Sequence, residues 1–355
     1  MSRAAQWVDA RVPTAVVHLD VAGCGRPSQA VLAAEVAHLQ QEAELGAYVA
    51  QARAEPAVDA GRDALGAMVG LAGADVCFVD GAGTAFATLL HAWPLPRGAR
   101  IGYTAGEYGA NARALRRLAR ERDWTLVLLP VDADGRVVAV PAGLDLVTFP
   151  QVASQRGTAQ PVRDVLAEGV PLLLDVAQSL GQVPVPAGCA AYVGTSRKWL
   201  CGPRGVGFAV VSPQVQIGLE EPPTLAPTHG DGMLRWESQE AHVAGRVGLA
   251  VAAQEWEPSL AGVVEQRSSY AREVLDGVAG WRVREPVAAP TGITTLEGGD
   301  PGATRSRLLI EGFVTSAIPA SRADELTGPV LRVSTAAWVT EAELDALSGA
   351  LARTG

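Results

Sequence analysis

Lysine is almost absent from this sequence, which makes the one lysine conspicuous. Lysine and arginine together number 29 among 355 residues, and Lys198 is the single lysine. Acidic residues number 38, for a formal net charge of −9. Nucleic acids are bound through clustered lysine and arginine, so this balance argues against a nucleic-acid partner. Most lysines are solvated surface groups, yet Lys198 follows an apolar run and precedes a loop rich in glycine and proline.

Cysteine and histidine are also scarce, which leaves little material for a metal site. The four cysteines, Cys24, Cys77, Cys189 and Cys201, lie far apart and form no C-x-x-C pair. The five histidines form no H-x-x-x-H pair. We therefore expect no metal ion, and we expect the cysteines to be reduced, structural thiols.

Long apolar runs are missing as well. The N-terminus has no positively charged head followed by an apolar stretch of signal-peptide length, and no run of about 18 uncharged apolar residues could span a membrane. We expect a cytoplasmic protein without a membrane partner. Its 355 residues, 48% of them hydrophobic, suffice for two domains or for one domain with a smaller lobe.

Short apolar runs that alternate with helical patterns dominate the first two thirds of the chain. Strands that are apolar on both faces and alternate with helices are typical of a mainly parallel sheet covered by helices. The strand-type runs lie at residues 75–81, 100–108, 125–132, 144–152, 170–178, 190–196 and 207–213, and the helical patterns between them at 84–93, 110–123 and 160–169.

The pattern changes beyond these runs. Residues 219–232 are rich in proline, glycine and threonine and predict an ordered crossing loop, after which a long helix follows from about residue 240 to 256. The remainder mixes helical patterns with short strands at 292–298 and 330–338, as in a smaller α+β lobe.

Three segments place polar side chains where strands end, the edge at which open parallel sheets bind ligands. The first, "VDGAGTAF", turns from a strand into a helix through Gly81 and Gly83. Such a turn can hold a phosphate on its free N–H groups, although any strand-to-helix turn favours glycine. The second ends in Asp175, which could cap a helix or meet a positive partner, and the third carries Thr195 and Lys198. Together they match the needs of pyridoxal 5'-phosphate: donors for its phosphate, a carboxylate for its ring nitrogen and a lysine for its aldehyde.

The sequence resembles the class V aminotransferase family of fold-type I pyridoxal phosphate enzymes. The segments that carry the resemblance span most of the chain: "VHLDVAGCGRPS", "GAGTAF", "GEYGAN", "ASQRGTAQPV", "LLLDVAQSLG", "GTSRKWLCGPRGVGF" and "VLRVSTAAW". It implies an α/β fold, with a mainly parallel, helix-covered seven-stranded sheet in a large domain, residues 16–255. Residues 256–355, with 1–15, would form a smaller α+β C-terminal domain. The resemblance also implies a homodimer, because relatives build each active site at the subunit interface.

The resemblance assigns roles to the polar residues of these segments. Lys198 would form the covalent link to the cofactor aldehyde and then move protons at the substrate α-carbon. Asp175 would pair with the ring nitrogen, and Gln178 would hydrogen-bond the ring 3'-oxygen. Tyr108 takes the place where many relatives stack a histidine on the ring, a task that any flat aromatic face can perform. Arg332 corresponds to the arginine that binds the substrate α-carboxylate, although on residue type alone it could be a surface arginine.

The remaining cofactor contacts implied by the resemblance surround the phosphate and the ring edge. Ala82 and Gly83 would offer backbone N–H groups and Thr195 a hydroxyl. Arg197 replaces the usual histidine before the lysine, and Ser154 stands where relatives often carry an asparagine.

The reaction type is indicated by a residue that is missing. Cysteine desulfurases use a mobile cysteine of the C-terminal lobe, whereas no cysteine follows Cys201 here, which disfavours that activity. Several segments are most similar to the carbon–sulfur lyases of ergothioneine biosynthesis. This implies β-elimination from a sulfur-containing amino acid, a cysteine-conjugate sulfoxide, with release of pyruvate and ammonia. An aminotransferase or desulfurase-like activity on another amino acid stays open, as does a cofactor-free binding or structural protein that descends from this family. Trp236, Glu237 and Glu240 are candidates for a wall that faces a trimethylammonium group.

Overall fold

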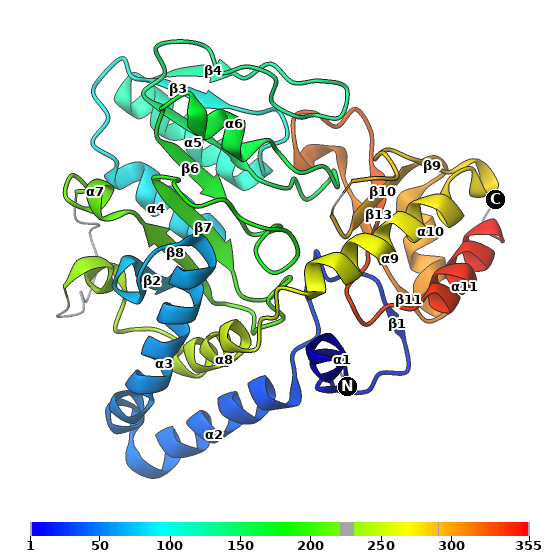
Figure 1. Cartoon of the computed structure of the whole chain (residues 1–355), viewed down its shortest axis with the longest axis horizontal. Coiled ribbons are helices and arrows are strands. Elements are labelled where there is room, and N and C mark those ends of the chain that lie inside the picture. The colour runs from blue at the N-terminus through cyan, green and yellow to red at the C-terminus, as the bar shows by residue number, and fades with distance from the viewer. Residues whose placement is uncertain (1, 221–230, 290, 354–355) are drawn as a thin grey trace.

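A seven-stranded sheet forms the centre of the larger part of the molecule (Figure 1). The computed structural model describes residues 2–220, 231–289 and 291–353. Neighbouring strands are parallel except at β8, which is antiparallel to both of its neighbours. The expected α/β fold with a mainly parallel seven-stranded sheet is confirmed. In order across the sheet, the strands are β2 (Val76–Val79), β8 (Gly207–Val211), β7 (Ala191–Thr195), β6 (Leu172–Asp175), β5 (Leu146–Pro150), β3 (Arg100–Tyr103) and β4 (Thr125–Leu128).

Helices cover both faces of this sheet, which explains why its central strands are apolar along their whole length. On β6, Leu172 and Leu174 pack into one hydrophobic cluster and Leu173 packs into the other. The first cluster includes residues of α3, α6 and α8, and the second includes residues of α4 and α5. The helices of this part are α2 (Gln29–Leu45), α3 (Ala47–Val69), α4 (Ala82–Ala92), α5 (Gly109–Arg122), α6 (Val162–Ala167), α7 (Pro213–Gln216) and α8 (Val243–Gln254), with the 3-10 helices η1 (Gly73–Asp75) and η2 (Gly232–Trp236).

The segment between α7 and α8 contains the expected crossing loop, 219–232. Residues 221–230 of this loop lie outside the described residues. The long helix expected after about residue 240 is α8, and His242 accepts a hydrogen bond from the Gly245 N–H at its start.

A four-stranded antiparallel sheet organises the smaller part of the molecule, at the right of Figure 1. A separate parallel pair joins the start of the chain to this part. The four strands in order are β12 (Ser316–Ile318), β13 (Val330–Ser334), β10 (Ile293–Glu297) and β9 (Arg282–Val283); the pair is β1 (Val17–His18) with β11 (Phe313–Val314); the helices are α9 (Leu260–Leu275), α10 (Pro301–Ile310) and α11 (Glu341–Ala352), with η3 (Val278–Gly280) and η4 (Ala320–Arg322).

The N-terminal segment packs against the C-terminal part. Trp7 of α1 (Arg3–Asp9) stacks on Trp338 with ring centroids 5.7 Å apart. Asp20 forms a parallel β-bridge with Ser334, the last residue of β13. Because β1 also joins the smaller part, residues 17–18 extend the N-terminal contribution slightly past residue 15. The division into 16–255 and 256–355 stays a prediction.

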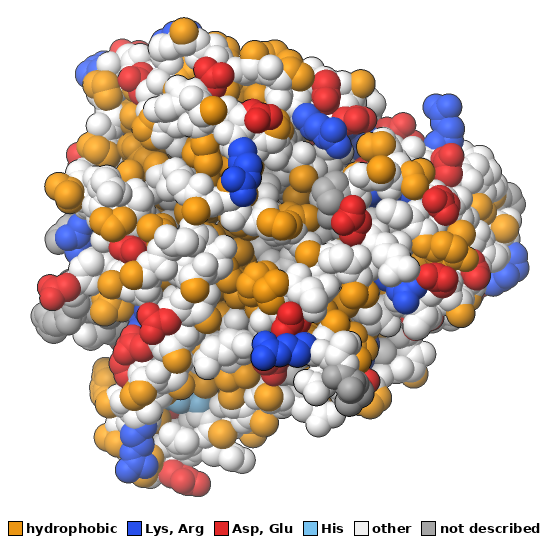
Figure 2. Space-filling view, viewed as in Figure 1, with side chains coloured by type: hydrophobic (Ala, Val, Ile, Leu, Met, Phe, Trp, Pro, Cys, Tyr) orange, Lys and Arg blue, Asp and Glu red, His pale blue; other side chains and the backbone are white. Residues whose placement is uncertain are grey.

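Positive charge is dispersed over the face drawn in Figure 2, where basic side chains lie singly or in small groups among acidic and apolar ones. None of the described helices combines the length and apolar character that crossing a bilayer requires. Within the described part of the chain, no three His, Cys, Asp or Glu side chains are grouped as metal ligands would be.

Candidate active site

One cavity of about 590 Å³ lies at the carboxyl ends of the central strands and between the two parts of the molecule. It is lined by all ten residues that the resemblance assigned to the cofactor, the covalent link and the substrate carboxylate, although their individual roles stay predictions. These residues are Ala82, Gly83, Tyr108, Ser154, Asp175, Gln178, Thr195, Arg197, Lys198 and Arg332.

Lys198 stands in a short connection between β7 and β8 that backbone hydrogen bonds hold in place. Its carbonyl accepts the Cys201 N–H at 2.9 Å, and the Arg197 carbonyl accepts the Gly25 N–H at 2.6 Å. Burial lowers the pKa of Lys198 to about 7, a shift that Asp175 opposes and that the nearby arginines reinforce. In a large fraction of the molecules Lys198 is therefore a neutral amine at neutral pH. This is the form that attacks an aldehyde.

Asp175 ends β6 and is buried, with 5% of its surface exposed. Its Oδ1 accepts the Ala177 N–H at 2.8 Å, and its Oδ2 accepts the Asn111 side-chain amide at 3.0 Å. No helix starts here, so the alternative of a helix cap is wrong. Burial raises the pKa of Asp175, whereas Lys198 and the two hydrogen bonds favour its ionised form.

Asn111 and Glu107 were missed by the sequence analysis, although both lie in the segment "GEYGAN". Asn111 Nδ2 also donates to Glu107 Oε1 at 3.1 Å, and the Tyr108 N–H donates to the same oxygen at 2.8 Å. Burial raises the pKa of Glu107 to about 8, and the charge of Asp175 adds to the shift. Glu107 and Asn111 lie four residues apart across the start of α5, and this spacing was the available signal.

Gln178 is anchored by both ends of its amide. Its Nε2 donates to the Ala22 carbonyl at 2.9 Å, and its Oε1 accepts the Trp199 indole N–H at 2.9 Å. An amide nitrogen carries two hydrogens, so one N–H of Gln178 remains for a ligand. The Thr195 hydroxyl has only a long 3.5 Å contact to the Val206 carbonyl and is available in the same way.

The turn from β2 into α4 presents free backbone N–H groups to one side of the cavity. Gly81, Ala82 and Gly83 line the cavity, and no side chain caps the N-terminus of α4, which begins at Ala82. A Cβ on Gly207 would lie 2.6 Å from the Gly81 Cα, so β8 can pass this turn only as glycine. The free N–H groups and the positive end of the helix dipole suit an anion.

Arg332 enters the cavity from β13 of the smaller part and is 3% exposed. Its guanidinium pairs with Asp20 at 2.8 Å, and its Nη1 donates to the Ser154 carbonyl at 3.0 Å. The Ser154 hydroxyl donates a hydrogen bond to the side chain of the next residue, at Gln155 Oε1, over 3.1 Å. The alternative of a surface arginine on a strand is therefore wrong.

The three candidates for a wall that faces a trimethylammonium group, Trp236, Glu237 and Glu240, do not line this cavity. Glu237 is 2% exposed and accepts hydrogen bonds from two arginines, Arg62 and Arg246, and from the Phe78 N–H. Trp236 is buried in the core cluster of α4 and α5, and neither residue lines the cavity. The prediction for Trp236 and Glu237 is wrong because two buried cations compensate the carboxylate, which sequence alone did not reveal.

The four cysteines are free thiols in the structure. Burial raises the pKa of Cys77, Cys189 and Cys201 to about 12, so these thiols stay protonated and unreactive at neutral pH. Cys24 is partly exposed, and burial raises its pKa as well.

The donor set fits pyridoxal 5'-phosphate at each end of the cavity. The uncapped start of α4 and the Thr195 hydroxyl would hold the phosphate, and Asp175 would hold a proton at the ring nitrogen. Lys198, with a pKa of about 7, would supply the amine for the aldehyde.

Comparison with known proteins points to the same group of enzymes. The family model for aminotransferase class-V matches residues 17–233. A probable hercynylcysteine sulfoxide lyase of Mycobacterium tuberculosis (strain CDC 1551 / Oshkosh) is 38% identical over 379 residues, which cover 99% of this chain and 93% of the relative. A cysteine desulfurase of Dickeya dadantii (strain 3937) is 27% identical over 270 residues, 67% of this chain and 65% of that relative.

Solved structures share the fold over nearly the whole chain. The cystine C–S lyase C-DES, in complex with cysteine persulfide, superposes with a TM-score of 0.86 at 20% identity, covering 96% of this chain and 98% of that one. The cysteine desulfurase CsdA from Escherichia coli superposes with a TM-score of 0.84 at 18% identity, covering 99% and 98%.

Proposed function

Since this chain belongs to the class V aminotransferase family, we propose that it is a carbon–sulfur lyase that cleaves hercynylcysteine sulfoxide. The products would be the sulfenic form of ergothioneine, pyruvate and ammonia. The observation that carries the proposal is the 38% identity to a probable hercynylcysteine sulfoxide lyase over 99% of the chain. The protein is a pyridoxal phosphate-dependent enzyme, so the predictions of family, enzyme and cofactor are confirmed.

The residues of the large sheet would prepare the cofactor. Bound pyridoxal phosphate supplies an electron-poor ring that accepts the electron pair of a substrate Cα–H bond. Asp175, held by hydrogen bonds from the Ala177 N–H and the Asn111 amide, would keep the ring nitrogen protonated. Lys198 would take the α-proton, and its lowered pKa of about 7 suits a base that works at neutral pH.

The bond that breaks is between the β-carbon and sulfur. The α-proton goes to Lys198, the electron pair leaves on sulfur as a sulfenate, and water converts the remaining three-carbon fragment to pyruvate and ammonia. A sulfenate is a competent leaving group, so no enzymic thiol has to attack. This agrees with the absence of cysteine after Cys201 and with the burial of the Cys201 side chain.

Arg332 would bind the α-carboxylate of the substrate. A guanidinium offers two parallel N–H groups that match a carboxylate. Asp20, paired with Arg332 at 2.8 Å, would hold the guanidinium in place.

The same proposal includes a cytoplasmic homodimer. Exposed apolar side chains on α2 support the dimer. Leu32, Val36 and Leu39 are 39%, 53% and 47% exposed and recur at helical spacing. Light scattering on the purified protein would measure the mass, and a monomer at micromolar concentration would contradict the dimer.

Incubation of the holoenzyme with hercynylcysteine sulfoxide tests the reaction. We expect pyruvate and ammonia in equal amounts, and ergothioneine after addition of a thiol reductant. The alternatives are read from the same samples: a keto acid with amino transfer indicates an aminotransferase, and a persulfide indicates a desulfurase. Formation of neither pyruvate nor ergothioneine by cofactor-loaded enzyme would overturn the proposal.

A further inference from the structure

A second arginine from the smaller part of the molecule lines the cavity beside Arg332. Arg322 ends η4, directly after β12, and its side chain is partly exposed. Its guanidinium carbon lies 5.5 Å from the centroid of the Tyr108 ring. The site therefore presents two guanidinium groups on the side that faces the substrate.

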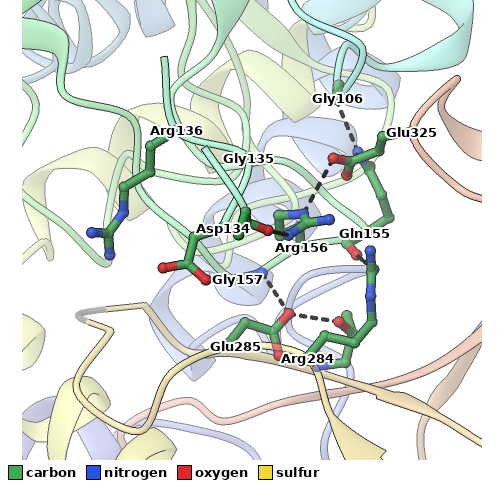
Figure 3. A network of polar contacts seen from close by, with 12 residues as sticks. Gly106, Asp134, Gly135, Arg136, Gln155, Arg156, Gly157, Arg284, Glu285 and Glu325 are labelled. Atoms are coloured by element: carbon green, nitrogen blue, oxygen red, sulfur yellow. Dashed lines mark hydrogen bonds and ion pairs between the residues drawn. The ribbon is translucent and has the colours of Figure 1, made fainter. Parts of the chain in front are cut away.

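The acidic neighbours of Arg322 are committed to other partners. Asp324 forms an ion pair with Arg116 of α5. Glu325 accepts the Gln155 side-chain amide at 2.9 Å and pairs with Arg156 at 3.2 Å (Figure 3). Neither carboxylate is left for Arg322.

The same contacts tie the Arg322 loop to the larger part. The Glu325 N–H donates to the Ala105 carbonyl at 3.1 Å, and Gln155 Nε2 donates to the Gly106 carbonyl at 2.9 Å (Figure 3). Arg284 of the smaller part donates to the Gln155 carbonyl at 2.9 Å. Because Glu325 is anchored on one side of Arg322 and β12 pairs with β13 on the other, the backbone that carries Arg322 is held beside the cavity.

The Arg322 guanidinium has no hydrogen-bond or ion-pair partner among the described residues. Its charge nevertheless affects the pKa of two neighbouring groups. It lowers the pKa of Lys198 and of Arg332, after the larger effect of burial on each. Of the two carboxylates that line the cavity, Asp175 is engaged by Ala177 and Asn111, and Asp80 has no contact to Arg322. A guanidinium without a carboxylate partner, close to a second arginine, is the arrangement of a site that receives an anion.

We propose that Arg322 is a specificity-determining residue that binds a second carboxylate, carried by the sulfur substituent of the substrate. The proposal rests on the carbon–sulfur lyase function and assigns a residue to the second carboxylate, which the hercynine part of hercynylcysteine sulfoxide carries. Arg332 takes the α-carboxylate, and Arg322 takes the distal one, since guanidinium and carboxylate match in shape and charge. A neutral S-substituent of equal size would leave Arg322 without a partner.

Two ligands that differ only in this charge test the proposal: S-(2-carboxyethyl)-L-cysteine and its amide, S-(2-carbamoylethyl)-L-cysteine. Binding to the holoenzyme is measured by calorimetry, with pyruvate assayed in the same samples. We expect the acid to bind about tenfold or more tightly than the amide, the fold-change of a charge-assisted hydrogen bond. In Arg322→Gln the preference should disappear while the affinity for the amide changes less than about threefold.

Matched variants separate this effect from a general loss of charge or fold. Arg113→Gln removes an exposed arginine of α5 that does not line this cavity, and it should keep the preference. Arg322→Lys should keep part of it, and Arg332→Gln should weaken both ligands. Circular dichroism and the visible cofactor band verify that each variant is folded and loaded.

Equal weakening of both ligands in Arg322→Gln would overturn the proposal, because it would mean that Arg322 binds a group common to both or supports the loop. A wild-type enzyme that does not distinguish the two ligands would overturn it as well. The binding readout does not depend on turnover, so a preference for the acid without any lyase activity would refute the proposed function and leave the second carboxylate site standing.

Discussion

The two walls of the cavity differ in how their charges are compensated. On the wall built by the large sheet, Asp175 is buried and held by two hydrogen bonds, and its charge acts on the neighbouring Lys198. On the wall built by the smaller part, Arg332 is paired with Asp20, whereas Arg322 has no hydrogen-bond or ion-pair partner among the residues that the structure describes. Asp175 is buried and needs a compensating charge, so the first wall suits a resident cofactor. Arg322 is partly exposed, so water can solvate it until an anionic group arrives with the substrate.

Removal of Lys198 should have the largest effect on catalysis, since it removes the reactive amine from the wall that the large sheet builds. We expect Lys198→Ala to lower kcat for pyruvate release by at least about 10²- to 10⁴-fold, the range of a lost general base, and to lose the covalent link to the cofactor. Borohydride treatment followed by mass measurement should label the wild type only. Full lyase activity in the variant would contradict the assigned role.

The pH dependence of cofactor loading is expected to show the next largest effect. Only the neutral amine of Lys198 attacks the aldehyde, so the loading rate of the apoenzyme should rise with pH and level off above about 7, the lowered pKa. Below pH 7 it should fall about tenfold per pH unit. Asp175 raises the pKa of Lys198, so Asp175→Asn should move the inflection lower, and Arg332→Gln should move it higher.

Stopped-flow recording of the visible band would give these loading rates. An inflection near 10 in the wild type would show that burial does not act on Lys198 as the structure indicates. Arg113→Gln serves as the control, because Arg113 does not line the cavity.

Substitution of Glu107 should have the smallest effect on catalysis. Its pKa of about 8 means that it is mostly protonated at pH 7, so Glu107→Gln should keep kcat/KM within about threefold. Glu107→Ala leaves the Tyr108 N–H and the Asn111 amide without their acceptor and should lower the free energy of unfolding by about 1–3 kcal/mol.

The same residue makes a prediction about stability and pH. The pKa of Glu107 is raised from 4.5 to about 8, so its contribution to stability is full below the unfolded value and is lost as pH rises toward 8. Denaturant unfolding of wild type and Glu107→Gln between pH 4.5 and 8 would measure the difference between their free energies of unfolding. As pH rises, the variant should become more stable relative to the wild type. A constant difference across that range would contradict a buried, protonated Glu107.

The wall of the large sheet was largely predictable from sequence because its signals are local. An apolar strand that ends in Asp175 and a glycine turn before a helix can be recognised within a few residues, and the parallel arrangement then brings strand ends together. Asn111 was missed because its hydrogen bond to Asp175 spans 64 positions and no local pattern requires it.

On the wall built by the smaller part, Arg332 was the one residue predicted to line the site, and that prediction came from the family resemblance. Arg322 lies on a short 3-10 helix without a periodic pattern, and its lack of a partner depends on where Asp324 and Glu325 find theirs. Glu237 was expected to face a ligand, but it is paired within the protein. Arg62, which lies 175 positions away in the sequence, donates a hydrogen bond to its carboxylate.

The sequence by itself determined the order of strands and helices, the single lysine and the carboxylate at the end of β6, because periodicity and residue type act over short distances. The tertiary structure decided which charges are compensated and which remain open. Compensation depends on contacts between distant segments, as in the pairs Arg332–Asp20 and Glu325–Arg156, and these form only when the two parts of the molecule pack together.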